Sequence, residues 1–493
     1  MGRSTAVLCT AMLFAACATT VPVSPRVKML DSSKTRLQNQ DAYFSTEYRR
    51  INDRRAHFGF PHAEGNARPA KIISLALSGG GIRSNAFQLG VLAGLHEVPF
   101  GSATLYDRVD YISSVSGGTW ANLAVWAWPD DMNALFACLD QGADKGFANA
   151  KAANPQCADA LLMLRTFQRV RILPTPWDQR KEVWQHDIEA NSLRRCNPQS
   201  FAPLTEPCGQ NALATKPYFI ANSTHDSPND LSDPADHFPF ETTPDGIATV
   251  IDDGKPHKGF MLAFAPEGEQ WRRRKFFMAR LHLPGGLPDG TTLSLTAAHS
   301  SAVLEGALGG VRALFLDFYM GLANGQKRVE ADTLRSHYVL ADGGKSEDTG
   351  IVPLVDRGAD VIVASYMGRD SFPFQDFDNA DKQVTKLFGC TMSAIRERED
   401  SHPATQDGTY SCPNAAEKTM LHVHPWPTNV AGFVAKFPQD VQDYLRDDKD
   451  ARTFPQTKTL QTRYDEPLIR AYYLLGKAIA REKIAEYLRQ QLQ

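Results

Sequence analysis

The sequence predicts an α/β fold, because three apolar runs end at glycine-rich junctions and two of them lead into helices. Residues 72–77 are apolar and β-branched, as in a buried strand, and residues 85–97 carry apolar side chains at helical spacing. A second strand-like run precedes an apolar helix over residues 119–128. A third run, residues 337–341, ends at Asp342 and two glycines. Strands that alternate with helices in this way are typical of α/β domains.

The first junction, residues 78–84, contains three consecutive glycines, Gly79, Gly80 and Gly81. The first turn of a helix leaves backbone N–H groups unpaired, and its dipole favours negative charge. Glycines let these N–H groups approach an anionic oxygen closely, so the three residues are candidates for an oxyanion hole. Such a loop can also bind phosphate, and the motif by itself does not separate the two functions.

The second junction contains Ser116, between a strand and the apolar helix, with Ser114, Gly117 and Gly118 as small neighbours. A serine on a sharp strand-to-helix turn is exposed to substrate, and small neighbours leave room for close approach. Ser116 is therefore a candidate nucleophile. The alternative is a tight turn with a helix-capping serine.

The third run places Asp342 at the end of a strand, where a carboxylate can take the proton of a serine on a neighbouring strand. The alternative is an aspartate that only caps a turn, as Asp-Gly pairs usually do. With Ser116 as nucleophile and Asp342 as base, the chain has the parts that ester hydrolysis requires.

In order and spacing, residues 78–84, 114–118 and 342–344 resemble the three signature blocks of bacterial members of the patatin-like phospholipase family, with similarity to cytosolic phospholipase catalytic domains. The resemblance implies a three-layer α/β/α fold related to α/β-hydrolases, with helical and loop insertions. It implies a lipid acyl hydrolase of phospholipase A or lysophospholipase type that acts on phospholipid or lysophospholipid at a membrane surface. A Ser116–Asp342 dyad without histidine and the glycine amides would do this chemistry, with no cofactor and no metal.

Two residues depart from the family pattern, and the role of a third stays open. Ser114 stands where glycine is common, and serine is small enough for that position. Asp348 stands where asparagine is common, which puts the local hydrogen bonding after Asp342 in question, because a carboxylate does not donate as an amide does. Arg83 could bind a substrate phosphate or support the glycine loop.

Two other functions remain possible from the sequence. One is a Ser-His-Asp carboxylesterase or thioesterase, for which His299 is the histidine to test. The other is a catalytically silent, lipid-binding envelope lipoprotein. The net charge of −3 argues against nucleic-acid binding in both cases.

The N-terminus resembles a lipoprotein signal peptide over residues 1–16, with Cys17 as the lipidated residue. The apolar part is too short to span a bilayer. We expect an exported protein of the bacterial cell envelope, anchored in the outer membrane. An ordinary secretory signal, giving a soluble periplasmic or secreted protein, is the alternative.

Six cysteines follow Cys17 and fall into three couples that are close in sequence. The neighbour pairing is a hypothesis, since six cysteines allow fifteen connectivities. An oxidising compartment favours it, and the alternative is buried free thiols. The couples are Cys138 with Cys157, Cys196 with Cys208 and Cys390 with Cys412.

The domain organisation that we expect is a tether or N-terminal arm over residues 17–66, followed by a catalytic domain over residues 67–493. Residues 129–215 and 371–464 are expected insertions, the first of them a cap or lid. After Asp465, a helix carries apolar residues on one face, and this face is expected to dock on the core rather than lie on a membrane.

Two further motifs have competing interpretations. Residues 271–277 combine four cations with aromatic side chains and are either a contact with anionic lipid head groups or a solvated strand edge. His422 and His424 could ligate a metal, but a surface turn leading into Pro425 is the favoured interpretation.

Overall fold

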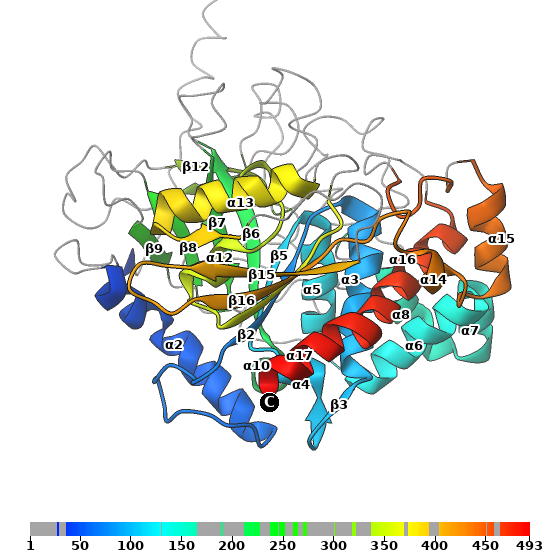
Figure 1. The fold of residues 1–493 in the computed structure, drawn as a ribbon, viewed down its shortest axis with the longest axis horizontal. Helices are drawn as coiled ribbons and strands as arrows, with labels where there is room; N and C mark the ends of the chain where they lie inside the picture. The colour runs from blue at the N-terminus through cyan, green and yellow to red at the C-terminus, as the bar shows by residue number, and fades with distance from the viewer. Residues whose placement is uncertain are drawn as a thin grey trace, which may run out of the picture.

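The structure, a computed structural model, confirms the predicted three-layer α/β/α fold, with one large sheet between two layers of helices (Figure 1). It describes residues 27–28, 36–129, 131–164, 188, 190, 212–226, 237–244, 246–251, 260–264, 270–273, 300, 318–321, 337–368, 373–393, 404–449, 451–457 and 464–493.

The main path of the sheet contains eleven described strands. In spatial order they are β1 (Val27–Lys28), β9 (Phe260–Phe264), β8 (Gly246–Ile251), β7 (His237–Thr243), β6 (Tyr218–Asp226), β5 (Tyr111–Val115), β2 (Ile73–Leu77), β13 (Val361–Ser365), β16 (Lys418–Val423), β15 (Thr405–Ser411) and β14 (Thr391–Met392). Three more strands extend in turn from β6, namely β12 (His337–Asp342), β11 (Phe318–Gly321) and β10 (Gln270–Arg273). A separate hairpin pairs β3 (Pro99–Phe100) with β4 (Ala103–Thr104).

The centre of the sheet is parallel, in the order β6, β5, β2, β13, β16. Every residue of β2, β5 and β13 is buried, because helices cover both faces of a parallel sheet. Consecutive residues alternate between two apolar clusters, so that Leu75 belongs to one and Ala76 to the other. The sheet is therefore the middle layer.

The helices form two groups. The first apolar cluster is covered mainly by α3 (Gly81–His96), α5 (Ser116–Ala127), α6 (Met132–Lys145) and α16 (Glu466–Ile479). The second is covered by α2 (Arg36–His57), α12 (Val352–Asp356) and α13 (Pro373–Phe388). In Figure 1, α3, α5, α6 and α16 lie toward the right of the view, whereas α2 lies at the lower left. Shorter elements are α4 (Leu105–Arg108), α7 (Phe147–Ala153), η1 (Pro155–Cys157), α8 (Ala158–Met163), α10 (Ala212–Thr215), η7 (Gly343–Lys345), α14 (Ala431–Val434), α15 (Gln439–Asp447), η8 (Ala480–Ile484) and α17 (Ala485–Leu492). Within the described ranges, no helix combines the length and the apolar character needed to cross a bilayer.

Docking of the C-terminal helix on the core is confirmed. Leu468, Tyr472, Leu475 and Ile479 on α16 are completely buried, and α16 crosses α3 closely. A Cβ added to Gly476 would overlap the carbonyl oxygen of Phe87 on α3. A Cβ on Gly90 would overlap the carbonyl oxygen of Tyr473 on α16, and one on Gly94 would lie 2.6 Å from that of Lys477. Glycines therefore set the short distance between the two helices.

Part of the expected tether or N-terminal arm forms α2, which packs into the core. Phe44 on this helix is buried in the second apolar cluster, and its charged residues find partners inside the protein. Arg55 donates to Asp110 at 2.8 Å, and Glu47 accepts from Arg357 at 2.8 Å. The segment is polar in sequence, but these buried ion pairs satisfy several of its charges, so the helix packs as part of the core.

The two expected insertions are also more integral than predicted. In the described residues 131–164, helix α6 places Leu135 and Leu139 in the first apolar cluster beside α16, so this part is core rather than lid. The stretch 371–464 contributes β15 and β16 to the main sheet, and β16 pairs parallel with β13. Its polar, proline-rich sequence concealed these strands.

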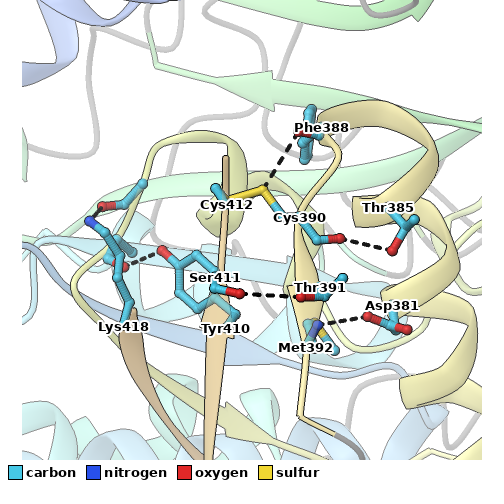
Figure 2. The surroundings of a disulfide bond; sticks show 12 residues. Asp381, Thr385, Phe388, Cys390, Thr391, Met392, Tyr410, Ser411, Cys412 and Lys418 are labelled. Carbon is cyan, nitrogen blue, oxygen red and sulfur yellow. Dashed lines mark hydrogen bonds between the residues drawn. A yellow bond between two sulfur atoms is a disulfide. The ribbon is translucent and has the colours of Figure 1, made fainter. Parts of the chain in front are cut away.

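Two of the three predicted disulfide couples are confirmed. Cys138 pairs with Cys157, and Cys390 pairs with Cys412, whereas Cys196 and Cys208 lie outside the described residues. Figure 2 shows the second bond, which joins Cys390, directly before β14, to Cys412, directly after β15. It thus links the paired ends of the two edge strands β14 and β15.

Candidate active site

Ser116 occupies a strained turn between β5 and α5. Its φ of 48° is in the left-handed region, which a residue with a side chain adopts only where the surroundings demand it. The two residues that follow have no room for a side chain, because a Cβ on Gly117 would overlap the carbonyl oxygen of Gly81, and one on Gly118 would lie 2.5 Å from the carbonyl oxygen of Leu77. The start of α5 is thus pressed against the glycine loop that follows β2, as in a nucleophile elbow.

The base candidate, Asp342, reaches Ser116 because β5 and β12 meet end to end along β6. Val115, the last residue of β5, pairs with Asn222, and Asp342, the last residue of β12, pairs with the next residue, Ser223. The first pairing is parallel and the second antiparallel, so the two strands approach each other from opposite directions. The Oγ atom of Ser116 donates to Oδ2 of Asp342 at 3.0 Å across 226 positions of sequence.

The carboxylate of Asp342 is held from the side away from Ser116. Gly344 N–H donates to its Oδ1 at 2.8 Å, and the Thr224 hydroxyl donates to its backbone carbonyl at 2.7 Å. Asp342 therefore does cap the turn of η7, as the alternative interpretation expected, while its second oxygen faces Ser116. Both side chains are buried, with Ser116 4% and Asp342 3% exposed.

The predicted role of Gly79 in an oxyanion hole requires a correction. Gly79 N–H donates to the carbonyl oxygen of Asp348 at 3.0 Å, so this amide anchors the loop and is not a free oxyanion donor. Gly80 and Gly81 have φ values of 129° and 63°, which glycine adopts without strain. Gly81 begins α3, where the first N–H groups have no partner within the helix. The oxyanion assignment narrows to Gly80 and Gly81.

Arg83 lies inside the protein rather than at the surface of the site. It is completely buried, and its guanidinium donates to the carbonyl oxygens of Thr457 and Gly368. These contacts tie the first turn of α3 to the segment after β13 and to a segment before α16. This geometry matches the loop-support role and leaves no exposed fork for a phosphate.

The two departures from the family pattern have different surroundings. Ser114 is buried, donates to the carbonyl of Ile220 at 3.2 Å and accepts from Asn122 at 3.0 Å, so its hydroxyl is accommodated. The carboxylate of Asp348 lies against Gly79 and Gly344, where a Cβ on either glycine would overlap it or come within 2.7 Å of it. Asp348 therefore packs between the glycine loop and the turn that carries Asp342.

The turn after Asp342 is organised by Glu347. Its buried carboxylate accepts from the backbone N–H of Thr349 at 2.6 Å and of Gly350 at 2.9 Å. Burial raises the pKa of Glu347 to about 7, against the lowering effect of these hydrogen bonds. Because Glu347 precedes the residue whose carbonyl holds Gly79, it links the Asp342 turn to the glycine loop.

Sequence reasoning missed two residues at the elbow, Ser300 and Asn222. The Ser116 N–H donates to Ser300 Oγ at 3.1 Å, and Asn222 donates to the Ser113 hydroxyl at 2.8 Å and to the Ser114 carbonyl at 2.9 Å. No spacing or motif indicated either residue.

The histidines are placed differently from expectation. His422 lies on β16 with 1% exposure and His424 is 5% exposed, so the expected surface turn is wrong. Burial, with a smaller contribution from His424, lowers the pKa of His422 to about 3. No group of three or more potential metal ligands occurs among the described residues. His299 and Cys17 lie outside the described residues.

The cationic run at residues 271–277 is described only at its beginning. Residues 271–273 belong to β10, which pairs antiparallel with β11, so this part of the run is a strand. Contact with lipid head groups stays a prediction.

The comparisons with known proteins point to one fold. No family model matches the chain, and no curated protein matches its sequence. The structure of human GIVD cytosolic phospholipase A2 is similar with a TM-score of 0.56 and 16% identity, over 95% of this chain and 66% of that chain. Structures of the same human protein with methyl gamma-linolenyl fluorophosphonate, without and with terbium chloride, each give a TM-score of 0.50 and 16% identity, over 95% and 65% of the two chains. The chain spans just under two thirds of the length of that phospholipase and has its three-layer α/β/α fold.

Proposed function

We propose that the chain is a lipid acyl hydrolase of phospholipase A or lysophospholipase type, with Ser116 as nucleophile and Asp342 as its base. The observation that carries the proposal is the 3.0 Å hydrogen bond from Ser116 Oγ to Asp342 Oδ2 on a left-handed elbow beside a glycine loop. Similarity to the fold of a cytosolic phospholipase A2 supports a lipid ester as the substrate.

In the first half-reaction, Asp342 accepts the proton of Ser116 Oγ while this oxygen attacks the carbonyl carbon of the ester. The N–H groups of Gly80 and Gly81 stabilise the negative oxygen of the tetrahedral intermediate. The intermediate then expels the lipid alcohol, which takes the proton from Asp342, and an acyl-Ser116 ester remains. In the second half-reaction, water attacks that ester with Asp342 again as base, which releases the fatty acid and restores Ser116.

The low exposure of the dyad supports this direct transfer. In a buried site, interactions between charges are stronger than in water, so donors aimed at the developing oxyanion have a larger effect. The buried guanidinium of Arg83 would act from behind, by keeping the glycine loop in place. Recognition of the phosphate would then fall to other residues.

Export and anchoring through Cys17 are part of the proposal. The disulfides Cys138–Cys157 and Cys390–Cys412 support an oxidising compartment, because such bonds are rare in the cytosol. Replacing Cys17 with Ala should release the protein from the membrane fraction and remove the mass of the lipid. An unchanged mass and membrane fraction in Cys17→Ala would contradict the anchor.

The test of the enzymatic proposal is labelling with a fluorophosphonate probe, followed by release of fatty acid from a panel of defined phospholipids and lysophospholipids. Wild-type protein should label and turn over, and Ser116→Ala should do neither while its melting temperature stays near that of the wild type. Ser74→Ala is a matched control, since Ser74 is an equally buried hydroxyl on the neighbouring strand β2. Labelling that persists in Ser116→Ala would place the nucleophile elsewhere. Loss of activity in His299→Ala would favour the Ser-His-Asp alternative, and a folded wild type that neither labels nor hydrolyses would favour the silent lipid-binding protein.

A further inference from the structure

The backbone N–H of Ser116 needs a partner from outside its own helix. Ser116 is the first residue of α5, and N–H groups in the first turn of a helix have no acceptor within the helix. The residue is buried and its φ is 48°, so both an unpaired N–H and the strained backbone have to be stabilised by the surroundings. The Oγ atom of Ser300 accepts this N–H at 3.1 Å.

All hydrogen-bonding positions of the Ser300 hydroxyl are used. A serine hydroxyl has one proton to donate and two lone pairs to accept. Ser300 donates its proton to the carbonyl oxygen of Asn222 at 2.5 Å. The hydroxyl of Thr119, 2.8 Å away, must therefore donate to Ser300, and the Ser116 N–H occupies the second lone pair. Ser300 is completely buried, so the bulk solvent does not reach its hydroxyl.

The three partners of Ser300 surround the elbow. Asn222 pairs with Val115 in the sheet, Ser116 is the turn itself, and Thr119 lies one helical turn further along α5. Asn222 is also the residue directly before Ser223, with which Asp342 pairs. The Ser300 hydroxyl thus connects Ser116 and the first turn of α5 to Asn222 on β6, the residue next to the one that pairs with Asp342.

We propose that Ser300 is a positioning residue for Ser116. It holds the Ser116 backbone in its left-handed conformation, which keeps Oγ at hydrogen-bonding distance from Asp342, and it engages the Ser116 N–H so that this amide does not bind the oxyanion. The inference rests on the proposed function, because positioning matters only if Ser116 is the nucleophile. Ser300 itself transfers no proton to or from substrate.

The experiment is the rate of fluorophosphonate labelling, together with kcat and KM on one defined lipid, for wild type, Ser300→Ala, Ser300→Thr, Thr119→Val and Ser74→Ala. Ser300→Ala should lower labelling and kcat by roughly 10- to 100-fold, because a displacement of about 1 Å at a reacting atom has an effect of this size. KM should stay within about twofold, since a loss that appears in kcat alone affects the transition state rather than binding. The pH profile should keep its shape, because the proton-accepting group is unchanged. Ser300→Thr keeps the hydroxyl and should recover part of the rate.

Two variants separate positioning from general stability. Thr119→Val removes one donor to Ser300 but keeps the bond from Ser116, and it should slow labelling less than Ser300→Ala does. Ser74→Ala removes a buried hydroxyl that has no hydrogen-bond partner among the described residues, and it should label at the wild-type rate. Labelling of a folded Ser300→Ala at the wild-type rate would overturn the inference. If Ser300→Ala does not fold, an unchanged rate in Thr119→Val would overturn it. Wild-type protein that fails to label would instead refute the proposed function, so the two failures are distinct.

Discussion

Two buried polar regions of the same sheet differ in how well their polar groups are satisfied. Around Ser116, the serine, its N–H, Asp342 and the hydroxyl of Ser300 all have hydrogen-bond partners at 2.5–3.1 Å. On β16, neither ring nitrogen of His422 is hydrogen-bonded within the described part of the chain, and the imidazole instead meets the ring of Phe377 edge to face at 4.6 Å. The comparison teaches that burial alone does not identify a site, whereas directed hydrogen bonds to both the side chain and the backbone of a strained residue indicate one.

The largest effect should come from removing the charge of the base. Asp342→Asn keeps an acceptor for the Gly344 N–H but removes the carboxylate that we propose as the proton acceptor of Ser116. We expect kcat to fall by about 10²- to 10⁴-fold, the usual contribution of a general base, with little change in melting temperature. Steady-state release of fatty acid and a thermal melt measure the two quantities. An active Asp342→Asn would contradict the comparison, because the hydrogen bonds around Ser116 would then not mark a catalytic site.

The contact between the elbow and the glycine loop should be the next most sensitive feature. Gly117→Ala places a Cβ onto the carbonyl oxygen of Gly81, and we expect the free energy of unfolding to fall by about 1–3 kcal/mol, as for an overpacked core, together with a loss of labelling. Denaturant unfolding measures the first effect. Gly432→Ala is the matched control, because a Cβ at Gly432 on α14 meets nothing within 4 Å. Equal stabilities of the two variants would show that the elbow tolerates displacement.

The unsatisfied region should appear in the pH dependence of stability. The pKa of His422 is lowered to about 3 in the folded protein, so the unfolded chain binds a proton that the folded chain does not as the pH falls below about 6.5. The contribution of neutral His422 to the free energy of unfolding is fully present above pH 6.5 and is lost as the pH falls toward 3. At pH 5, this one group should already have lowered the free energy of unfolding by about 2 kcal/mol.

The measurement is the difference in unfolding free energy between wild type and His422→Leu from pH 8 to pH 5. The difference is needed because Glu347 and Glu241, whose pKa values burial raises to about 7, act with the opposite sign. They bind protons more readily when folded, so their contribution to stability grows as the pH falls. His422→Leu should gain on the wild type as the pH decreases. A constant difference would mean that the imidazole has a proton-accepting partner.

The smallest effect should come from Ser74, which is a second unsatisfied group. Ser74 Oγ is buried in β2 without a hydrogen-bond partner among the described residues. Ser74→Ala removes a desolvated hydroxyl, so we expect the free energy of unfolding to change by less than about 1 kcal/mol, in the stabilising direction. Equilibrium denaturation at neutral pH checks this. A clear destabilisation would show that Ser74 has a partner and would weaken the contrast between the two regions.

The elements that were predictable are those that local sequence specifies. The run at residues 72–77 forms β2 from Ile73 to Leu77, and the two junctions lead into α3 and α5 as expected. Both helices begin earlier than apolar periodicity suggested, at Gly81 and at Ser116 themselves. Their first turns carry polar residues such as Arg83, which donates to carbonyl oxygens of distant segments. These residues do not contribute to an apolar pattern in the sequence.

The errors have the same physical origin. The polar segment that forms α2 was predicted to be a tether or N-terminal arm, and residues 371–464 were predicted to be an insertion. Both contain polar residues that tertiary partners satisfy, such as Glu47 with Arg357. Hydrophobic patterning detects residues that avoid water, but it does not detect a polar residue whose partner lies elsewhere in the chain.

The sequence by itself determined two strand–turn–helix units, the glycines that open them and an aspartate at the end of a third strand, because each depends on residues that are close in the chain. Only the tertiary structure decided that β12 pairs antiparallel with β6 directly after the point where β5 ends. Asp342 and Val115, the residue before Ser116, therefore pair with consecutive residues of β6. It also decided that Gly79 is an anchor, that Arg83 is buried and that Ser300 contacts the elbow. Strand register between distant segments follows from the packing of both faces of the sheet, and no local pattern encodes it.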